Sequence, residues 1–144
     1  MSNDHRNVHR NVETLRVLYQ DLTRIDEFAD PAIVLHKADR GAGGGLSMAI
    51  GKRAVRNHEL ELVERAHQTL QMEVHEIVAN DDFGTVLGTL HATCEGQTIG
   101  MPFCGVWRFQ DGKVIEHWEH AFDARVLGGF LMGDPTRAVR WIGR

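Results

Sequence analysis

The chain has 144 residues, of which 42% are hydrophobic and 25% charged, so we expect one globular domain with a sizeable core. A formal net charge of −4 argues against a nucleic-acid partner, because such surfaces usually carry a basic patch. No apolar run reaches the roughly 18 residues of a membrane span, and the N-terminus lacks the apolar segment of a secretory signal. We therefore expect no membrane partner and a cytoplasmic location.

The first half of the chain predicts helices and a loop. Residues 1–7 are polar and are expected to form a flexible tail, with residues 8–144 forming the single domain. Apolar residues recur at spacings of three and four over residues 8–25, which predicts one amphipathic helix. The glycine run at 41–45 lacks the GK[ST] ending of a phosphate loop and predicts a flexible loop. A second helix is predicted over 52–68, with its buried face at Val55, Leu62 (or Val63) and Ala66.

After Thr69 the apolar residues alternate with a period of two, which is typical of strands. Four strands are predicted, over residues 70–78, 84–96, 100–109 and 114–122, joined as an antiparallel meander. Helices followed by such a meander define an α+β fold. Strands this long must twist and curl, so helices on the concave side are expected to enclose a pocket. Cys94 and Cys104 are interpreted as reduced thiols of a cytoplasmic protein.

The last predicted hairpin, around "GKVIEHWEH" at 112–120, carries an unusual density of ionisable groups. Two registers remain open. A two-residue turn would pair Gln110 with Lys113 and place Trp107 on the face of Glu116 and Trp118, whereas a three-residue loop would place Trp107 with His117 and Glu119. The face of His117 and Glu119 is the better pocket wall, because residues two apart in a strand can meet one ligand.

The run "GVWRFQDGKVIEHWEHAFD" resembles the corresponding hairpin of SnoaL-like polyketide cyclases, as do "GMP" before it and "LGGFLMGDP" after it. The resemblance implies the cystatin-like α+β barrel, in which helices pack on a strongly curved, mainly antiparallel sheet. In those cyclases an acid/base aspartate occupies the position of Glu119. A histidine that assists it there corresponds to Gly105 here, so a second polar group must come from His117, His91 or elsewhere.

The candidate site follows from these observations. Glu119 is the expected acid/base group, with its pKa raised by burial toward ~6–7, and His117 would orient it or polarise the substrate. His91 and Asp123 are further catalytic candidates. The side chains expected to contact substrate are Trp107, Phe103, Phe109, Ile115 and His36, the last by family position beside the glycine loop. A metal site formed by His91, His117 and Glu119 is considered and not expected, and neither is a cofactor.

These residues favour a small-molecule enzyme that uses cofactor-free acid/base catalysis on an apolar carbonyl substrate. The reaction would be a polyketide cyclisation of the aldol type, an isomerisation or a dehydration, so the enzyme would be a lyase or isomerase. The alternative is a non-catalytic ligand-binding or dimerisation module of the same fold. Val114, Trp118 and Phe122 would share the outer sheet face and are expected to form a homodimer.

Overall fold

The computed structural model describes residues 8–38, 47–66, 69–94 and 96–131. The expected flexible tail at 1–7, most of the glycine loop and residues 132–144 lie outside these described residues. In chain order the elements are α1 (Arg10–Leu18), the 3-10 turn η2 (Leu22–Arg24), α2 (Ile25–Phe28), β1 (Ala29–His36), β2 (Met48–Ile50), α3 (Lys52–Arg65), β3 (Gln71–Ala79), β4 (Phe83–Cys94), β5 (Gln97–Gln110), β6 (Lys113–Ala121) and α4 (Ala124–Leu131).

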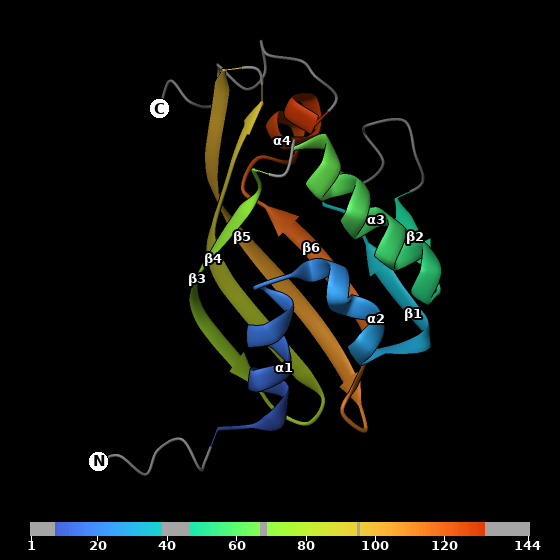
Figure 1. Cartoon of the computed structure of the whole chain (residues 1–144). Coiled ribbons are helices and arrows are strands. Elements are labelled where there is room, and N and C mark those ends of the chain that lie inside the picture. The colour runs from blue at the N-terminus through green and yellow to red at the C-terminus, as the bar shows by residue number, and fades with distance from the viewer. Residues whose placement is uncertain (1–7, 39–46, 67–68, 95, 132–144) are drawn as a thin grey trace, which may run out of the picture.

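One curved sheet of six strands forms the body of the fold, in the order β2-β1-β6-β5-β4-β3. All neighbouring strands are antiparallel except β1 and β6, which are parallel. The edge strands β2 and β3 do not pair with each other, so the sheet curls without closing. The helices lie on its concave side, with α1 near the turns of the long hairpins and α3 crossing above β1 (Figure 1). The expected α+β architecture is confirmed.

The first helix is shorter than the apolar spacing predicts. It ends at Leu18, and a new turn begins where the side chain of Asp21 accepts a hydrogen bond from the backbone N–H of Thr23 at 3.1 Å. Asp side chains favour such local caps over helix continuation. Leu15, Leu18 and Ile25 are nevertheless all buried, so the spacing identified the core residues correctly. Tyr19, the C-cap of the helix, lies four residues after Leu15 on the same face and is also buried.

Residues 29–36 form a strand, β1, that the sequence pattern did not predict. Ile33 and Leu35 are buried on its inner face, and its second half pairs with β6. Pro31 cannot donate a ladder hydrogen bond, and it lies within the register shift between Ala29 and Val34. The parallel pairing brings His36 beside Trp118, which places the two side chains on the same face of the sheet.

The hairpin between β5 and β6 combines features of both predicted registers. The turn has two residues, since Gln110 pairs with Lys113 and both Asp111 (φ 51°) and Gly112 (φ 80°) have positive φ, as a type I′ turn requires. Phe109 then pairs with Val114 but Arg108 pairs with Glu116, so one extra residue, Ile115, lies in a β-bulge.

The bulge reverses the faces of every residue after it. Trp107 pairs with His117 and Gly105 with Glu119, so His117 and Glu119 face inward despite the two-residue turn. Val114 precedes the bulge and is fully buried. Its expected place on the outer face with Trp118 and Phe122 is therefore wrong.

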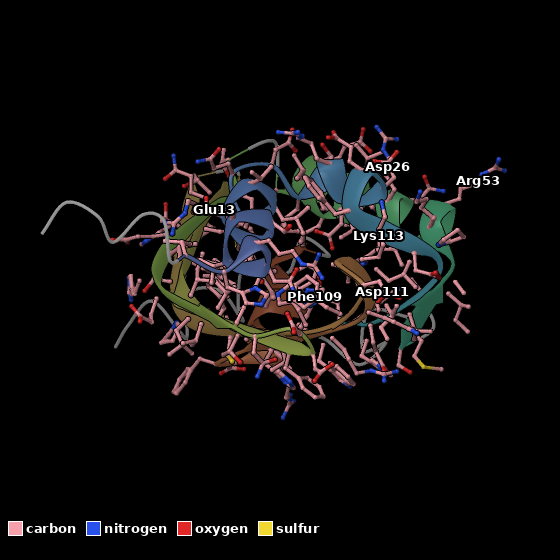
Figure 2. The ribbon with its side chains drawn as sticks, turned by 90° about the horizontal axis from the view of Figure 1, so that it is seen from below. Glu13, Asp26, Arg53, Phe109, Asp111 and Lys113 are labelled. Carbon is pink, nitrogen blue, oxygen red and sulfur yellow. The ribbon has the colours of Figure 1, made fainter. Side chains whose placement is uncertain are left out.

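The core is densely packed near the hairpin turns. Leu15, Trp107, Phe109 and Val114 are all at most 2% exposed there. Figure 2 shows Phe109 inside the curl of the sheet, whereas Glu13 and Arg53 point outward. At the far end, Val126 and Phe130 of α4 are buried. Within the described residues, no helix is long and apolar enough to cross a membrane.

The two cysteines do not face each other across the β4–β5 hairpin. Cys94 pairs with Gln97, whereas Cys104 pairs with Leu87. Seven residues of strand separate the two positions, about 24 Å at the usual rise per residue, which is far beyond the reach of a disulfide. Cys104 is a free thiol, as the sequence analysis expected.

Candidate functional site

A pocket lies between the concave face of the sheet and the helices, with a cavity volume of about 60 Å³, or about 540 Å³ when the space open to solvent is included. Its wall is mostly apolar and draws on both helices and strands. The larger apolar lining residues are Leu22, Leu62, Leu70, Met72, Leu90, Phe103 and Leu127. Four polar side chains, Tyr19, His117, Glu119 and the exposed His120, also line it. A small number of polar groups in an otherwise apolar pocket is typical of a small-molecule site.

His117 is held rigidly as a neutral imidazole. Its ring is only 4% exposed and stacks on the indole of Trp107, with ring centroids 3.4 Å apart. Nδ1 lies 3.0 Å from the carbonyl oxygen of Val106, so Nδ1 carries the proton and Nε2 presents a lone pair. Burial lowers the pKa of His117 to about 4, against the opposing attraction of Glu119. At neutral pH Nε2 is therefore a proton acceptor, while Nδ1 donates to Val106.

Glu119 is an ionised carboxylate held by several donors. His58 Nε2 lies 3.1 Å from one carboxylate oxygen and 3.2 Å from the other, and the backbone N–H of Ala38 donates to Oε1 at 3.2 Å. Burial raises the pKa of Glu119, but the hydrogen bond and charge of His58 and the charge of His117 outweigh burial and lower it to about 2. The expectation that burial would raise this pKa toward 6–7 is wrong, because it did not include His58.

His58 and Glu59 are site residues that the sequence analysis missed. Both lie on α3, and Glu59 is only 2% exposed. Burial, followed by the negative charge of the nearby Glu119, raises the pKa of Glu59 well above its usual range. The signal was present in the sequence, since the buried stripe from Val55 to Leu62 must pass through position 58 or 59 on a helix. A polar residue at such a position indicates a function or a partner.

Tyr19 occupies the space left by Gly105. A Cβ at position 105 would overlap the Tyr19 hydroxyl and lie 3.0 Å from Trp107 Nε1. Trp107 Nε1 donates to the Tyr19 oxygen at 3.2 Å, and the Tyr19 ring stacks on Phe103 at 5.6 Å. Burial raises the pKa of Tyr19 above its usual range, so its O–H stays protonated. A hydroxyl from the first helix thus lies where the related cyclases have a histidine on the strand.

Two of the predicted catalytic residues lie away from the pocket. The His91 imidazole is 3.2 Å from a carboxylate oxygen of Glu73, and both side chains are largely exposed. Asp123 caps α4, because its carboxylate accepts from the backbone N–H of Val126 at 3.1 Å. Neither residue lines the pocket.

Of the residues predicted to contact substrate, some lie at the pocket and others lie away from it. Phe103 lines the pocket, and Trp107 lies directly behind His117. Phe109 is buried in the packed core near the hairpin turns, and Ile115 is the bulge residue. The His36 ring stacks on Trp118 at 5.3 Å, and its Nε2 lies 2.7 Å from Glu116. His36 therefore lies on the outer face of the sheet and not at the pocket mouth.

The donor set of a metal site is present in one place among the described residues. Ligand atoms of His58, Glu59 and Glu119 all lie within 4.8 Å of one another, and one imidazole with two carboxylates suits a divalent ion such as Zn²⁺ or Mn²⁺. The group His91, His117 and Glu119 does not assemble, because His91 lies outside the pocket with Glu73. A proton shared by the two carboxyl groups would remove one of their two negative charges, whereas a divalent ion would neutralise both.

A curled α+β sheet, an apolar pocket and an inward carboxylate–imidazole pair are together typical of small-molecule sites. The model of the SnoaL-like domain family matches residues 9–117, so this chain belongs to that family. The match includes His117 and ends before Glu119. No curated protein matches the chain.

Several solved structures share the fold. Bal32a, from a soil-derived mobile gene cassette, superposes with a TM-score of 0.74 at 21% identity, covering 85% of this chain and 96% of that one. TerC, co-crystallised with polyporic acid, has a TM-score of 0.70 at 20% identity over 85% of this chain and 98% of its own. IdmH from Streptomyces antibioticus, described as a candidate polyketide cyclase, has a TM-score of 0.66 at 18% identity over 94% and 100%. These likenesses show a shared fold, which is described as cystatin-like in a further similar structure from Xanthomonas campestris.

Proposed function

We propose that the pocket catalyses cofactor-free proton transfer next to the carbonyl group of an apolar substrate. The observation that carries this proposal is the pairing of Glu119 and His117 on the wall of an otherwise apolar pocket. Polyketide cyclisation of the aldol type, isomerisation and dehydration all begin with such a step. The family membership and the description of IdmH as a candidate polyketide cyclase support this class.

The geometry suggests a division of roles between the two residues. Glu119 is stabilised as an anion by His58 and the Ala38 N–H, which makes it the weaker base. His117 has the higher pKa of the two and an available lone pair on Nε2. We therefore assign proton abstraction to His117 and stabilisation of the resulting imidazolium to the Glu119 charge, which reverses the roles expected from the sequence.

The Tyr19 hydroxyl is the donor best suited to the substrate oxygen. Its oxygen already accepts from Trp107, so its own proton is available to a group in the pocket. A hydrogen bond to a developing enolate oxygen is worth more in a site without water. Neutral His117 cannot donate to the substrate oxygen, because its one N–H, at Nδ1, already donates to the carbonyl oxygen of Val106.

Deuterium uptake from D₂O at the α-carbon of an apolar aryl ketone tests the proposal without knowledge of the final product. We expect His117→Gln to lower the exchange rate by about 10²–10⁴-fold and Glu119→Gln to lower it substantially, with circular dichroism unchanged in both. If the exchange rate fell only in Glu119→Gln and not in His117→Gln, Glu119 would be the base. Full exchange in both variants would mean that other residues catalyse it and would overturn these roles. No exchange above background in the wild type on a panel of such ketones would favour the non-catalytic binding module.

A further inference from the structure

A carboxyl group with no donor is buried behind the pocket wall. Glu59 is 2% exposed, and neither of its carboxyl oxygens has a hydrogen-bond partner among the described residues. The carboxyl group of Glu119 and the imidazole of His58 are the nearest ionisable groups, within 4.8 Å. Two ionised carboxylates this close together would repel each other strongly, because the burial of Glu59 removes the screening by water.

The surroundings offer little compensation for a second negative charge. His58 already contacts both oxygens of Glu119, and the neighbouring His117 is neutral with its Nδ1 proton on Val106. The hydroxyl of Tyr19 and the thiol of Cys104 supply no positive charge to this region. The imidazole of His120 also lines the pocket, but it is exposed and acts on His117, whereas burial and Glu119 are what act on Glu59. A proton on Glu59 removes the repulsion and turns an unpaired acceptor into a donor.

We propose that Glu59 is a neutral carboxylic acid at physiological pH that donates its proton in a hydrogen bond to Glu119, and that Glu59 and His58 together position the Glu119 anion beside His117. Glu59 and His58 are positioning residues, since neither lines the apolar pocket itself. The catalytic consequence rests on the proposed function, whereas the protonation state of Glu59 does not.

The arrangement explains why α3 carries two adjacent polar residues at its buried side. With donors from His58, Ala38 and Glu59, the charge of Glu119 has a defined place and does not need water. An anion held in this way stabilises the imidazolium of His117 at the moment it forms, without reorganisation. If one donor is lost, Glu119 becomes more basic and binds a proton itself, so its stabilising charge disappears at a higher pH.

The experiment compares three substitutions on α3. Glu59→Gln has the shape of a neutral glutamic acid and keeps a donor, Glu59→Leu removes the donor, and Glu61→Gln changes an exposed carboxylate on the same helix. Protein labelled with ¹³C at the glutamate carboxyl carbon reports each protonation state by NMR. We expect one protonated carboxyl resonance at neutral pH in the wild type and in Glu61→Gln, and its absence in Glu59→Gln.

Kinetics provide the second measurement. We expect Glu59→Leu to lower the rate of α-deuterium exchange at least tenfold and to move the acidic limb of its pH profile upward, with Glu59→Gln retaining a larger fraction of the rate than Glu59→Leu. A merely structural role would not move the pH profile. If the wild type itself shows no exchange, the proposed function fails, and the carboxyl resonance still decides the protonation state.

Two results would overturn the inference. The first is a wild-type protein whose glutamates are all ionised at neutral pH. The second is one equivalent of a divalent metal in the purified wild type, measured by mass spectrometry, that Glu59→Gln lacks. In that case His58, Glu59 and Glu119 would bind an ion in place of the proton.

Discussion

The two ends of the interior are built on different principles. At the hairpin end, Leu15, Trp107, Phe109 and Val114 fill the space between α1 and the sheet and are at most 2% exposed. At the pocket end, α3 contributes His58 and Glu59 in place of apolar side chains, beside the pocket. The comparison shows that apolar packing fills one end of the interior, whereas the other end contains buried polar groups, as expected where a fold departs from its packing rules for a functional site.

Trp107 lies at the border between the two ends, so its removal should have the largest effect on stability. Trp107→Ala removes the ring on which His117 stacks and the donor to Tyr19. We expect a loss of about 3–5 kcal/mol in the free energy of unfolding, measured by urea denaturation. A loss below about 1 kcal/mol would mean that the hairpin end does not dominate stability.

The neutral state of His117 makes the pocket end sensitive to acid. Its pKa is about 4 in the folded protein and 6.5 when unfolded, so the unfolded chain binds more protons between these values. The stability that this histidine contributes is present above pH 6.5 and is lost as the pH falls toward 4, on the order of 2–3 kcal/mol. We expect His117→Gln to flatten the dependence of the unfolding free energy on pH in this window.

The same measurement separates His117 from Glu119. The pKa of Glu119 is lowered from 4.5 to about 2, so its contribution is lost only as the pH falls from 4.5 toward 2. Glu59, whose pKa is raised, has the opposite sign and destabilises the fold as the pH rises above 4.5. An unchanged slope between pH 6.5 and 4 in His117→Gln would contradict the neutral buried imidazole.

A substitution at Gly105 tests whether the close approach of Tyr19 to this position limits the size of the residue there. Gly105→Ala places a Cβ against the Tyr19 hydroxyl, and we expect a loss of about 1–3 kcal/mol in unfolding free energy. The double variant Gly105→Ala/Tyr19→Phe should recover part of that loss, because the overlapping oxygen is gone. Thermal denaturation of the two single variants and the double variant measures this coupling, and strict additivity would argue against the overlap.

His91 provides the smallest expected effect, because it belongs to neither end of the interior. Its ion pair with Glu73 is largely exposed, and such pairs contribute little to stability. We expect His91→Gln to change the unfolding free energy by less than about 0.5 kcal/mol and to leave α-deuterium exchange at the wild-type rate. A large loss of exchange in this variant would place His91 in the site after all.

Some features of the site were accessible to sequence analysis because they depend on local patterns. Period-two alternation located β3 to β6, and the hairpin motif identified His117, Glu119 and Trp107 as neighbours. The partners from α3 were not found, because helical spacing identifies a buried position without showing which strand residue lies opposite. His36 was misplaced for a related reason, since its face depends on the parallel pairing of β1 with β6.

The sequence by itself determined the SnoaL-like family, the α+β class, the two-residue turn at Asp111 and Gly112 as one of two options, and the residues able to transfer protons. These properties follow from residue types at fixed spacings, which need no long-range contact. Only the tertiary structure decided which face of β6 lines the pocket, because one bulge residue at Ile115 exchanges the two faces. Only the tertiary structure, too, brought His58 and Glu59 to Glu119, sixty residues away along the chain, and so set the protonation of the site.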